Sequence, residues 1–141
     1  MATKSSGSPR VITIEVSPAE LLDKISILEI KSERISDSEK LANVRHELDI
    51  LRQVRQSDLP RTNGLSKLER NLKSINETLW DIEDQIRTCD AQNDFGATFI
   101  KLAQSVYREN DHRATVKKEI NLLLGASIVE EKSYAAYRSD T

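Results

Sequence analysis

The apolar residues of this chain recur mainly at the three- and four-residue spacings of an α-helix. The longest regular run occupies residues 65–89, where the steps are 3-4-3-4-3-4-3: Leu65, Leu68, Leu72, Ile75, Leu79, Ile82, Ile86 and Cys89. This spacing is typical of the contact positions of a coiled coil, and we call these positions the seam. The pattern predicts a central helix of about 37 Å, longer than its neighbours would cover.

The first half of the chain predicts two further helices. Ser17 followed by Pro18 is a strong helix start, and Glu20 is placed to complete a capping box. Apolar residues at helical spacing follow directly. A second helix is expected at about residues 38–57, and the loop at residues 58–64, rich in turn-forming residues, would let the central helix return antiparallel.

The second half predicts two helices separated by a short break. Asp94 is a candidate N-cap for the first of them, whose apolar face ends before Asn110 and Asp111. Because Asn and Asp disfavour helix interiors, we expect a break at these two residues and a last helix at about residues 112–124. Gly125 then suits the left-handed position after a helix end.

Outside the helices, residues 11–16 alternate apolar and polar side chains, which predicts a short β-strand with one buried face. Residues 1–10 are polar and rich in Ser, so a disordered tail is expected there, and residues 135–141 are expected to form a flexible C-terminal tail. The predicted fold class is all-α. It is an antiparallel helical bundle of about five helices in one domain at residues 11–134, with a long coiled-coil-like central helix and a short N-terminal strand.

Composition excludes several classes of function without identifying one. The chain has 141 residues, of which 38% are hydrophobic, 31% charged and 4% aromatic, and its net charge is −2. This balance suits helices and gives no overall basic field for nucleic acid, and no run of about 18 apolar residues predicts a membrane span. Cys89 is the only cysteine, so no internal disulfide is possible and a cytoplasmic location is expected.

The familiar catalytic motifs are missing: there is no glycine-rich phosphate loop, CxxC pair, HExxH motif or GxSxG elbow. Carboxylates at i,i+3 on two helices have the geometry that all-α nucleotide pyrophosphohydrolases use for Mg²⁺; they are Glu20 with Asp23, and Asp81 with Asp84. A zinc site would have to combine Cys89, His46 and His112, whose spacing fits no standard motif. The same carboxylates have simpler interpretations: Glu20 suits capping and an ion pair with Lys24, and Asp81 and Asp84 suit a solvent-exposed stripe of the central helix. No cofactor is therefore expected.

Polar side chains also follow one side of the seam, where partial burial would require them to have partners. They are Lys73, Asn76, Trp80, Glu83 and Arg87. The candidate partners are Lys24, Lys31 and Arg34 in the first helix, and Arg108, Asn110 and Arg113 near the predicted break. Two interpretations stay open: an interhelical salt-bridge network, which is the commoner arrangement, or a pocket for an anionic small molecule like that of the helical chorismate mutases.

Charge is unevenly distributed along the middle of the chain. Residues 52–73 hold six basic and two acidic residues, whereas residues 77–94 hold six acidic and one basic. Opposite charges beside an apolar seam select orientation, so we expect a homodimer through the seam, with pairing inside one chain as the alternative. In two antiparallel copies of the central helix the basic set faces the acidic set: Lys67, Arg70 and Lys73 against Glu77, Asp81 and Asp84.

Five segments, taken in order, resemble an uncharacterised family of short bacterial proteins that is catalogued as a domain of unknown function. They are ELLDKISILEIKSERI (residues 20–35), KLANVRHELDIL (40–51), INETLWDIEDQIR (75–87), FIKLAQSVYRENDHRA (99–114) and IVEEKSY (128–134). Members of that family lie beside, or are fused to, genes for glycosyl transfer and cell-surface polysaccharide assembly. The resemblance implies a bacterial cytoplasmic protein that serves envelope glycan synthesis, with a glycosyltransferase or another assembly protein as its partner.

The resemblance implies no reaction and no catalytic residue, but it directs attention to the polar positions inside the matching segments. These are Asp23, Lys24, Glu29, Lys31, Asn76, Glu77, Trp80, Glu83, Arg87, Tyr107, Arg108, Asn110, Asp111 and Arg113. Gln104 departs from the family pattern, which more often has Arg there, and this weakens the case for an anion pocket on that helix.

The residues and the resemblance together favour a self-associating accessory or binding module linked to polysaccharide assembly, rather than an enzyme. The alternative is a small-molecule enzyme or binding protein with a polar pocket for a carboxylate or phosphate ligand, with or without Mg²⁺. Such a pocket would use Lys24, Lys31, Asn76, Trp80, Glu83, Arg87, Arg108, Asn110 and Arg113. No catalytic or metal-binding residue is assigned.

Overall fold

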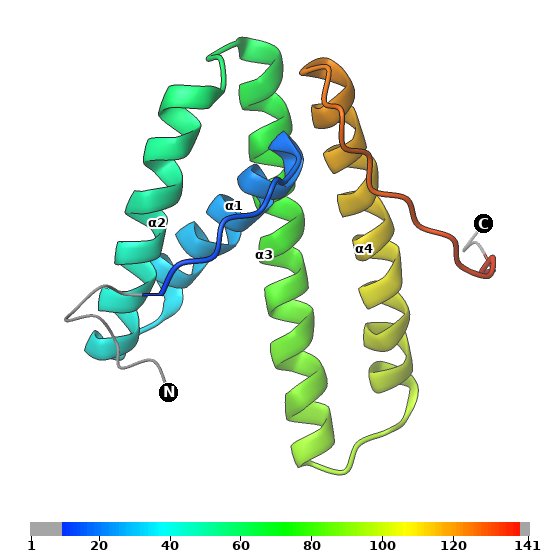
Figure 1. Cartoon of the computed structure of the whole chain (residues 1–141). Helices are drawn as coiled ribbons and strands as arrows, with labels where there is room; N and C mark the ends of the chain where they lie inside the picture. The colour runs from blue at the N-terminus through cyan, green and yellow to red at the C-terminus, as the bar shows by residue number, and fades with distance from the viewer. Residues whose placement is uncertain (1–9, 139–141) are drawn as a thin grey trace, which may run out of the picture.

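The computed structural model describes residues 10–138, and within that range the regular structure consists of four α-helices (Figure 1). Their bounds are α1 Pro18–Arg34, α2 Ser38–Asp58, α3 Asn63–Ala91 and α4 Ala97–Leu123. The all-α prediction is confirmed, and the start of α1 at Pro18 is as predicted. The expected number of five helices is wrong, because α4 is one helix where two were predicted.

Polar side chains cap the first three helices, whereas the N-cap of α4 is Gly96 and not the predicted Asp94. Ser17 accepts a hydrogen bond from the backbone N–H of Glu20 at 3.2 Å, and Pro18 occupies the first turn, where a missing N–H has no cost. Asp37 and Thr62 cap α2 and α3 in the same manner. The capping box itself is incomplete, because the Glu20 carboxylate turns to Lys117 instead.

The first helix joins the other three. α1 packs against α2, α3 and α4, while α2 packs closely only against α1. Figure 1 shows α3 and α4 side by side and antiparallel, with α1 running obliquely between them and α2. The core therefore lies around α1, whose buried residues meet those of α3 and α4; it includes Leu22, Ile25, Leu28, Leu65, Leu72 and Ile120.

The helix α4 continues through Asn110 and Asp111, so the predicted break is absent. The physical reason is visible in the side chains. The Asn110 amide oxygen accepts a hydrogen bond from Arg113 at 2.8 Å, and a side chain used in this way does not compete for the helix backbone. As a continuous helix of 27 residues, about 40 Å long, α4 extends along nearly the whole of α3.

The N-terminal strand predicted at residues 11–16 is also wrong. These residues have no regular secondary structure, and their apolar side chains are exposed, with Ile12 at 81% and Ile14 at 72%. A single strand is not stable without a partner for its backbone, and no strand exists within residues 10–138 to pair with it. The alternation of apolar and polar side chains is present in the sequence, but no neighbouring strand exists within residues 10–138 to form a sheet with it.

The chain reverses after α4 and returns along its surface. Gly125 adopts a left-handed backbone with φ of 63°, as its position predicted, and the Ala126 N–H donates to the Asn121 carbonyl at 2.9 Å. We call residues 126–138 the strap; Figure 1 shows it, in orange and red, beside α4. Most of the N-terminal tail predicted at residues 1–10, and residues 139–141 of the C-terminal tail, lie outside the described residues, and the flexibility of residues 135–138 stays a prediction.

Candidate functional site

Six of the nine predicted pocket residues line one cleft. The cleft lies between α1, α3 and α4, has a volume of about 460 Å³, and is called the central cleft below. The predicted residues in its lining are Asn76, Trp80, Glu83, Arg87, Asn110 and Arg113. Its apolar lining comes from all three helices: Ile27, Ile30, Leu79 and Val106. These six predicted residues therefore share one concave surface, which has an apolar part and several convergent polar groups.

Buried hydrogen bonds hold the polar residues of the cleft in place. Asn76, 5% exposed on α3, donates to the Asp23 carboxylate at 2.8 Å and to the Ser26 hydroxyl at 2.7 Å. Its amide oxygen accepts from Arg113 at 3.1 Å. The side chain of Asn76 thus connects α1 to α4 through α3, and its partners fix its orientation.

The guanidinium of Arg113 is held by two amides rather than by a carboxylate. Its two terminal nitrogens donate to Asn76 at 3.1 Å and to Asn110 at 2.8 Å, and no ion pair joins it to a carboxylate within the described residues 10–138. A guanidinium has five N–H donors, so these two hydrogen bonds leave three for other acceptors. Arg113 is therefore a positioned, half-buried cation whose charge is not neutralised by direct contact with an acidic side chain.

The mouth of the cleft is formed by Trp80, Glu83 and Arg87 on α3. Arg87 is 78% exposed and lies 3.6 Å from Glu83 in an i,i+4 pair, which is a weak interaction in water. The ring of Trp80 is half-buried, and the guanidinium of Arg34 lies 5.8 Å from its centre. Arg87 is thus an exposed cation at the entrance, whereas Arg113 is held inside by two hydrogen bonds.

A second cation on α4, Lys117, has the opposite environment from Arg113. Its ammonium, 14% exposed, lies 2.8 Å from Glu20, 3.7 Å from Asp23 and 3.3 Å from Glu130. Burial alone would lower the pKa of Lys117, but the hydrogen bond with Glu20 and the charges of the three carboxylates outweigh it, so this pKa is raised. The same hydrogen bond lowers the pKa of Glu20, against the opposing effect of its partial burial.

Three predicted pocket residues are not in the lining of the central cleft. Lys24 is exposed on α1, and Lys31 is half-buried in the last turn of the same helix. Arg108 points to the strap, where its guanidinium lies over the rings of Tyr107 and Tyr137 at 5.8 and 5.5 Å. Helical spacing places residues on a face, but it does not say which neighbouring helix will cover that face, and these three face elsewhere.

The proposed metal ligands are not brought together. Within the described part of the chain no group of three or more His, Cys, Asp and Glu side chains has a geometry suited to a metal ion. Three of the four carboxylates of the Mg²⁺ hypothesis are engaged by cations instead: Glu20 and Asp23 by Lys117, and Asp81 by Arg34 at 2.6 Å. Cys89 is a buried seam residue.

The seam of α3 is covered inside the chain. Leu65, Leu72, Leu79, Ile82 and Cys89 are all buried, and α1 and α4 pack against α3. The predicted homodimer surface is therefore occupied, because the continuous α4 covers the length that two shorter helices would have left open. Charged residues of the predicted dimer contact also pair within the chain, Lys73 with Glu33 at 2.8 Å and Asp81 with Arg34.

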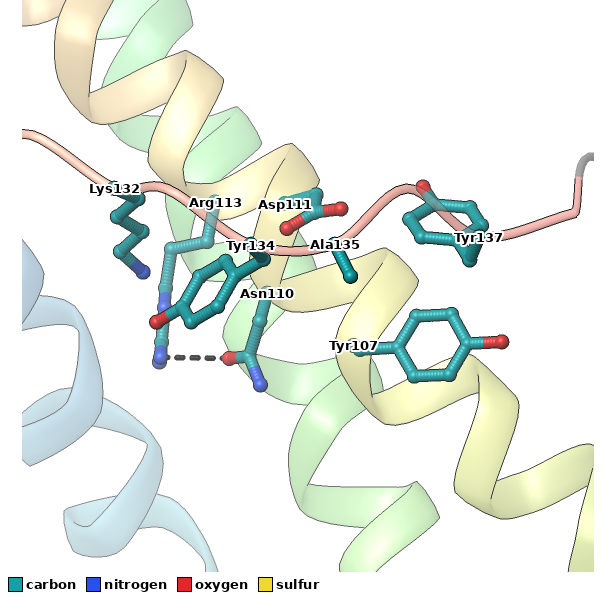
Figure 2. Close-up of a pocket in the computed structure, with 8 residues that line it drawn as sticks. All are labelled: Tyr107, Asn110, Asp111, Arg113, Lys132, Tyr134, Ala135 and Tyr137. Atoms are coloured by element: carbon teal, nitrogen blue, oxygen red, sulfur yellow. Dashed lines mark hydrogen bonds between the residues drawn. The ribbon is translucent and has the colours of Figure 1, made fainter.

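The strap and α4 together line a second cavity. Its volume is about 550 Å³, and Asn110 and Arg113 line it as well as the central cleft. Figure 2 shows the other lining side chains, which come from α4 and from the strap that crosses it: Tyr107, Asp111, Lys132, Tyr134, Ala135 and Tyr137. We call this space the strap cavity. Sequence reasoning assigned no binding role to Lys132 or Tyr134, although the segment IVEEKSY contains both.

Lys117 was missed for an identifiable reason. It follows Asn110 and Arg113 at helical spacing, so one uninterrupted face of α4 carries Val106, Asn110, Arg113, Lys117 and Ile120. The predicted break at Asn110 and Asp111 divided this face between two helices and hid its continuity. Reading the face as one unit would have placed Lys117 beside the cluster.

Comparison with known proteins assigns the chain to a family. Residues 12–140 match the Family of unknown function (DUF6165). The chain belongs to this family. No curated protein and no solved structure matches it. The matched region includes the strap and is longer than the part of the chain that the four helices occupy. Across the described residues, none of the helices combines the length and hydropathy that crossing a bilayer requires.

Proposed function

We propose that this DUF6165 protein is a small-molecule binding module whose ligand carries an oxyanion, a phosphate or carboxylate group, bound by Arg113 in the central cleft. The observation that carries this proposal is the contrast between Arg113 and Lys117, one helical turn apart on α4. Lys117 has three carboxylates around it, whereas Arg113 has only two amide oxygens. A purely structural network would be expected to neutralise both cations, because a buried charge is costly without a counter-charge.

The surroundings of Arg113 suit an anionic group on an organic molecule. Two amides orient the guanidinium before the ligand arrives, which reduces the entropy lost on binding. Arg87 at the mouth supplies a second positive charge, and the apolar lining, with Ile27, Ile30 and Val106, suits the non-polar part of a ligand. A volume of about 460 Å³ is within the range of small-ligand sites.

The test is calorimetric titration of the full-length protein with inorganic pyrophosphate and with citrate. We expect at least one of them to bind, and Arg113→Met to weaken the binding by roughly 100-fold, because a charge-assisted bidentate contact is lost. Arg113→Lys is expected to retain the charge and lose the fork geometry, with an intermediate loss. Lys24→Ala removes a cation outside the cleft and serves as the matched control.

Two outcomes would overturn the proposal. In one, neither anion binds the wild-type protein at millimolar concentration. In the other, Lys24→Ala weakens binding as much as Arg113→Met, which would mean that the anion responds to overall charge and not to the cleft. Circular dichroism of each variant establishes that it is folded.

The biological setting belongs to the same proposal. The resemblance to proteins encoded beside genes for glycosyl transfer supports an accessory role in bacterial cell-surface polysaccharide assembly, with a glycosyltransferase as a partner and the cytoplasm as the location. Phosphorylated sugars are accordingly the first organic ligands to test. The proposal is limited to binding, because no residue of the cleft has been assigned a catalytic role.

Self-association stays a prediction, but it needs a surface other than the seam. The exposed apolar side chains near the start of α4, Phe95 at 52% and Ile100 at 54%, are the candidates for that surface.

A further inference from the structure

We infer that the strap is part of the binding site: Lys132 and Tyr134 bind the same anion as Arg113, and together they select a phosphate group. This inference rests on the proposed function and adds to it the residues that complete the site and the class of anion. Asn110 and Arg113 line both the strap cavity and the central cleft, so an anion bound to Arg113 would be within reach of residues from both.

The strap is fastened to α4 at two points and free between them. At one point Glu130 lies 3.3 Å from Lys117. At the other, the ring of Tyr137 packs on that of Tyr107 with centroids 4.8 Å apart, and Arg108 donates to the Arg138 carbonyl at 3.1 Å. The residues between these fastenings arch over the strap cavity of about 550 Å³.

The free part of the strap presents two donors to Arg113. Side chains alternate in direction along an extended segment, so Lys132 and Tyr134 share a face, and both line the strap cavity while Ser133 does not. In Figure 2 the Lys132 ammonium, the Tyr134 hydroxyl and the Arg113 guanidinium lie toward the same side of the cavity. Neither Lys132 nor Tyr134 has a hydrogen-bonding side-chain partner within residues 10–138, and Tyr134 is 76% exposed.

One acidic residue, Asp111, also lines the cavity and would repel an anion. Its carboxylate belongs to the second fastening, because it interacts with the Tyr137 phenol. The partial desolvation of Tyr137 and the charge of Asp111 raise the pKa of that phenol, so the phenol stays a neutral donor. Figure 2 shows Asp111 nearer to Ala135 than to the guanidinium end of Arg113.

The arrangement of donors favours phosphate over carboxylate. A carboxylate is planar, and the fork of one Arg side chain satisfies it from one edge. A phosphate group has more oxygens, directed to the corners of a tetrahedron, and binds best where donors come from several sides. Arg113 is carried by α4, whereas Lys132 and Tyr134 are carried by the strap, so the three donors come from two separate segments of the chain.

The experiment titrates full-length variants with inorganic pyrophosphate and with citrate. We expect Lys132→Ala to raise the Kd for pyrophosphate roughly 10-fold and Tyr134→Phe several-fold, with smaller effects on citrate. Two variants are matched controls: Ser133→Ala changes the strap residue between them, and Lys118→Ala removes the same charge from a lysine of α4 that does not line the strap cavity. Both are expected to bind as the wild type does.

Hydrogen exchange provides a second measurement, because a change in the overall charge of the protein would not by itself alter ligand protection of the strap amides. Pyrophosphate should slow the exchange of amides 131–136 in the wild type, and this protection should disappear in the Lys132→Ala/Tyr134→Phe double variant. If Arg113→Met abolishes binding while the strap variants bind normally, the strap inference is overturned and the proposed function stands. If Lys118→Ala weakens binding as much as Lys132→Ala, the strap inference fails too. If the wild type binds neither anion, both fail.

Discussion

Individual polar side chains determine how α1, α3 and α4 meet. Asn76 is buried and contacts Asp23 and Ser26 on α1 and Arg113 on α4. Its amide nitrogen donates two hydrogen bonds, and its amide oxygen accepts one. Lys117 makes a second connection between α4, α1 and the strap. Buried polar groups of this kind are costly when a partner is lost, so they restrict the helices to one relative position.

The ion pair of Glu20 with Lys117 predicts a pH dependence of stability. Because the pKa of Glu20 is lowered from 4.5 in the folded protein, its contribution is present above pH 4.5 and is lost as the pH falls through the folded value. The pKa of Lys117 is raised from 10.5, so its contribution is present below pH 10.5 and is lost at higher pH.

Urea unfolding at pH 7, 5, 4 and 3 tests the acid side of this dependence. The free energy of unfolding is expected to fall more steeply below pH 4.5 in the wild type than in Glu20→Gln. Glu47→Gln, an exposed change on α2, serves as the control and should follow the wild type. Equal slopes for wild type and Glu20→Gln would contradict the assignment.

At the scale of elements, the continuity of α4 decides the architecture. An unbroken α4 covers the seam of α3 and places Asn110, Arg113 and Lys117 on one face toward α1. The residues that predicted a break are instead used by the site: Asn110 holds Arg113, and Asp111 contributes to the fastening of the strap. Local propensity was overruled because these side chains found partners elsewhere in the chain.

A proline substitution measures this continuity directly. His112 is exposed in the middle of α4, so His112→Pro should cost roughly 3 kcal/mol of unfolding free energy or more, because it removes a helix hydrogen bond and clashes with the preceding turn. His112→Ala isolates the loss of the side chain and should change stability by less than about 0.5 kcal/mol. Ala97→Pro lies at the first position of α4, where proline is tolerated. A His112→Pro protein as stable as His112→Ala would restore the predicted break.

At the scale of the whole molecule, one chain closes its own core. α1 and α4 cover the seam of α3. Polar side chains of α3 and α4 line the central cleft, and polar side chains of α4 also line the strap cavity. Because the seam is covered within the chain, we expect it to contribute to folding stability rather than to bind a second copy.

This difference is measurable with Ile82, a seam residue that is 7% exposed. Ile82→Ala should lower the unfolding free energy by about 3 kcal/mol, the usual cost of a cavity in a core. The melting temperature of both wild type and variant should not depend on protein concentration if the seam is an intrachain core. A melting temperature that rises with concentration in the wild type, and no longer does so in Ile82→Ala, would show that the seam is an interface between copies.

The amino-acid sequence by itself determined the local features of this protein. Helix starts at Pro18 and after Asp37, the 3-4 seam of α3 and the turn at Gly125 depend on residues a few positions apart, and their physics is local. Six cleft residues were also found from the sequence, because partial burial beside a seam requires polar partners.

Only the tertiary structure decided which side of each helix is covered and by what. Residues 11–16 remained without a strand partner, Lys24 and Lys31 stayed outside the cleft, and the strap joined α4 through Tyr137 and Glu130. These outcomes depend on contacts between residues far apart in the chain, such as Asn76 with Asp23 and Arg113. The periodicity of one helix carries no information about which helices will pack against it. The packing of α1, α3 and α4 therefore decided that Lys117 is surrounded by carboxylates whereas Arg113 is held by two amides.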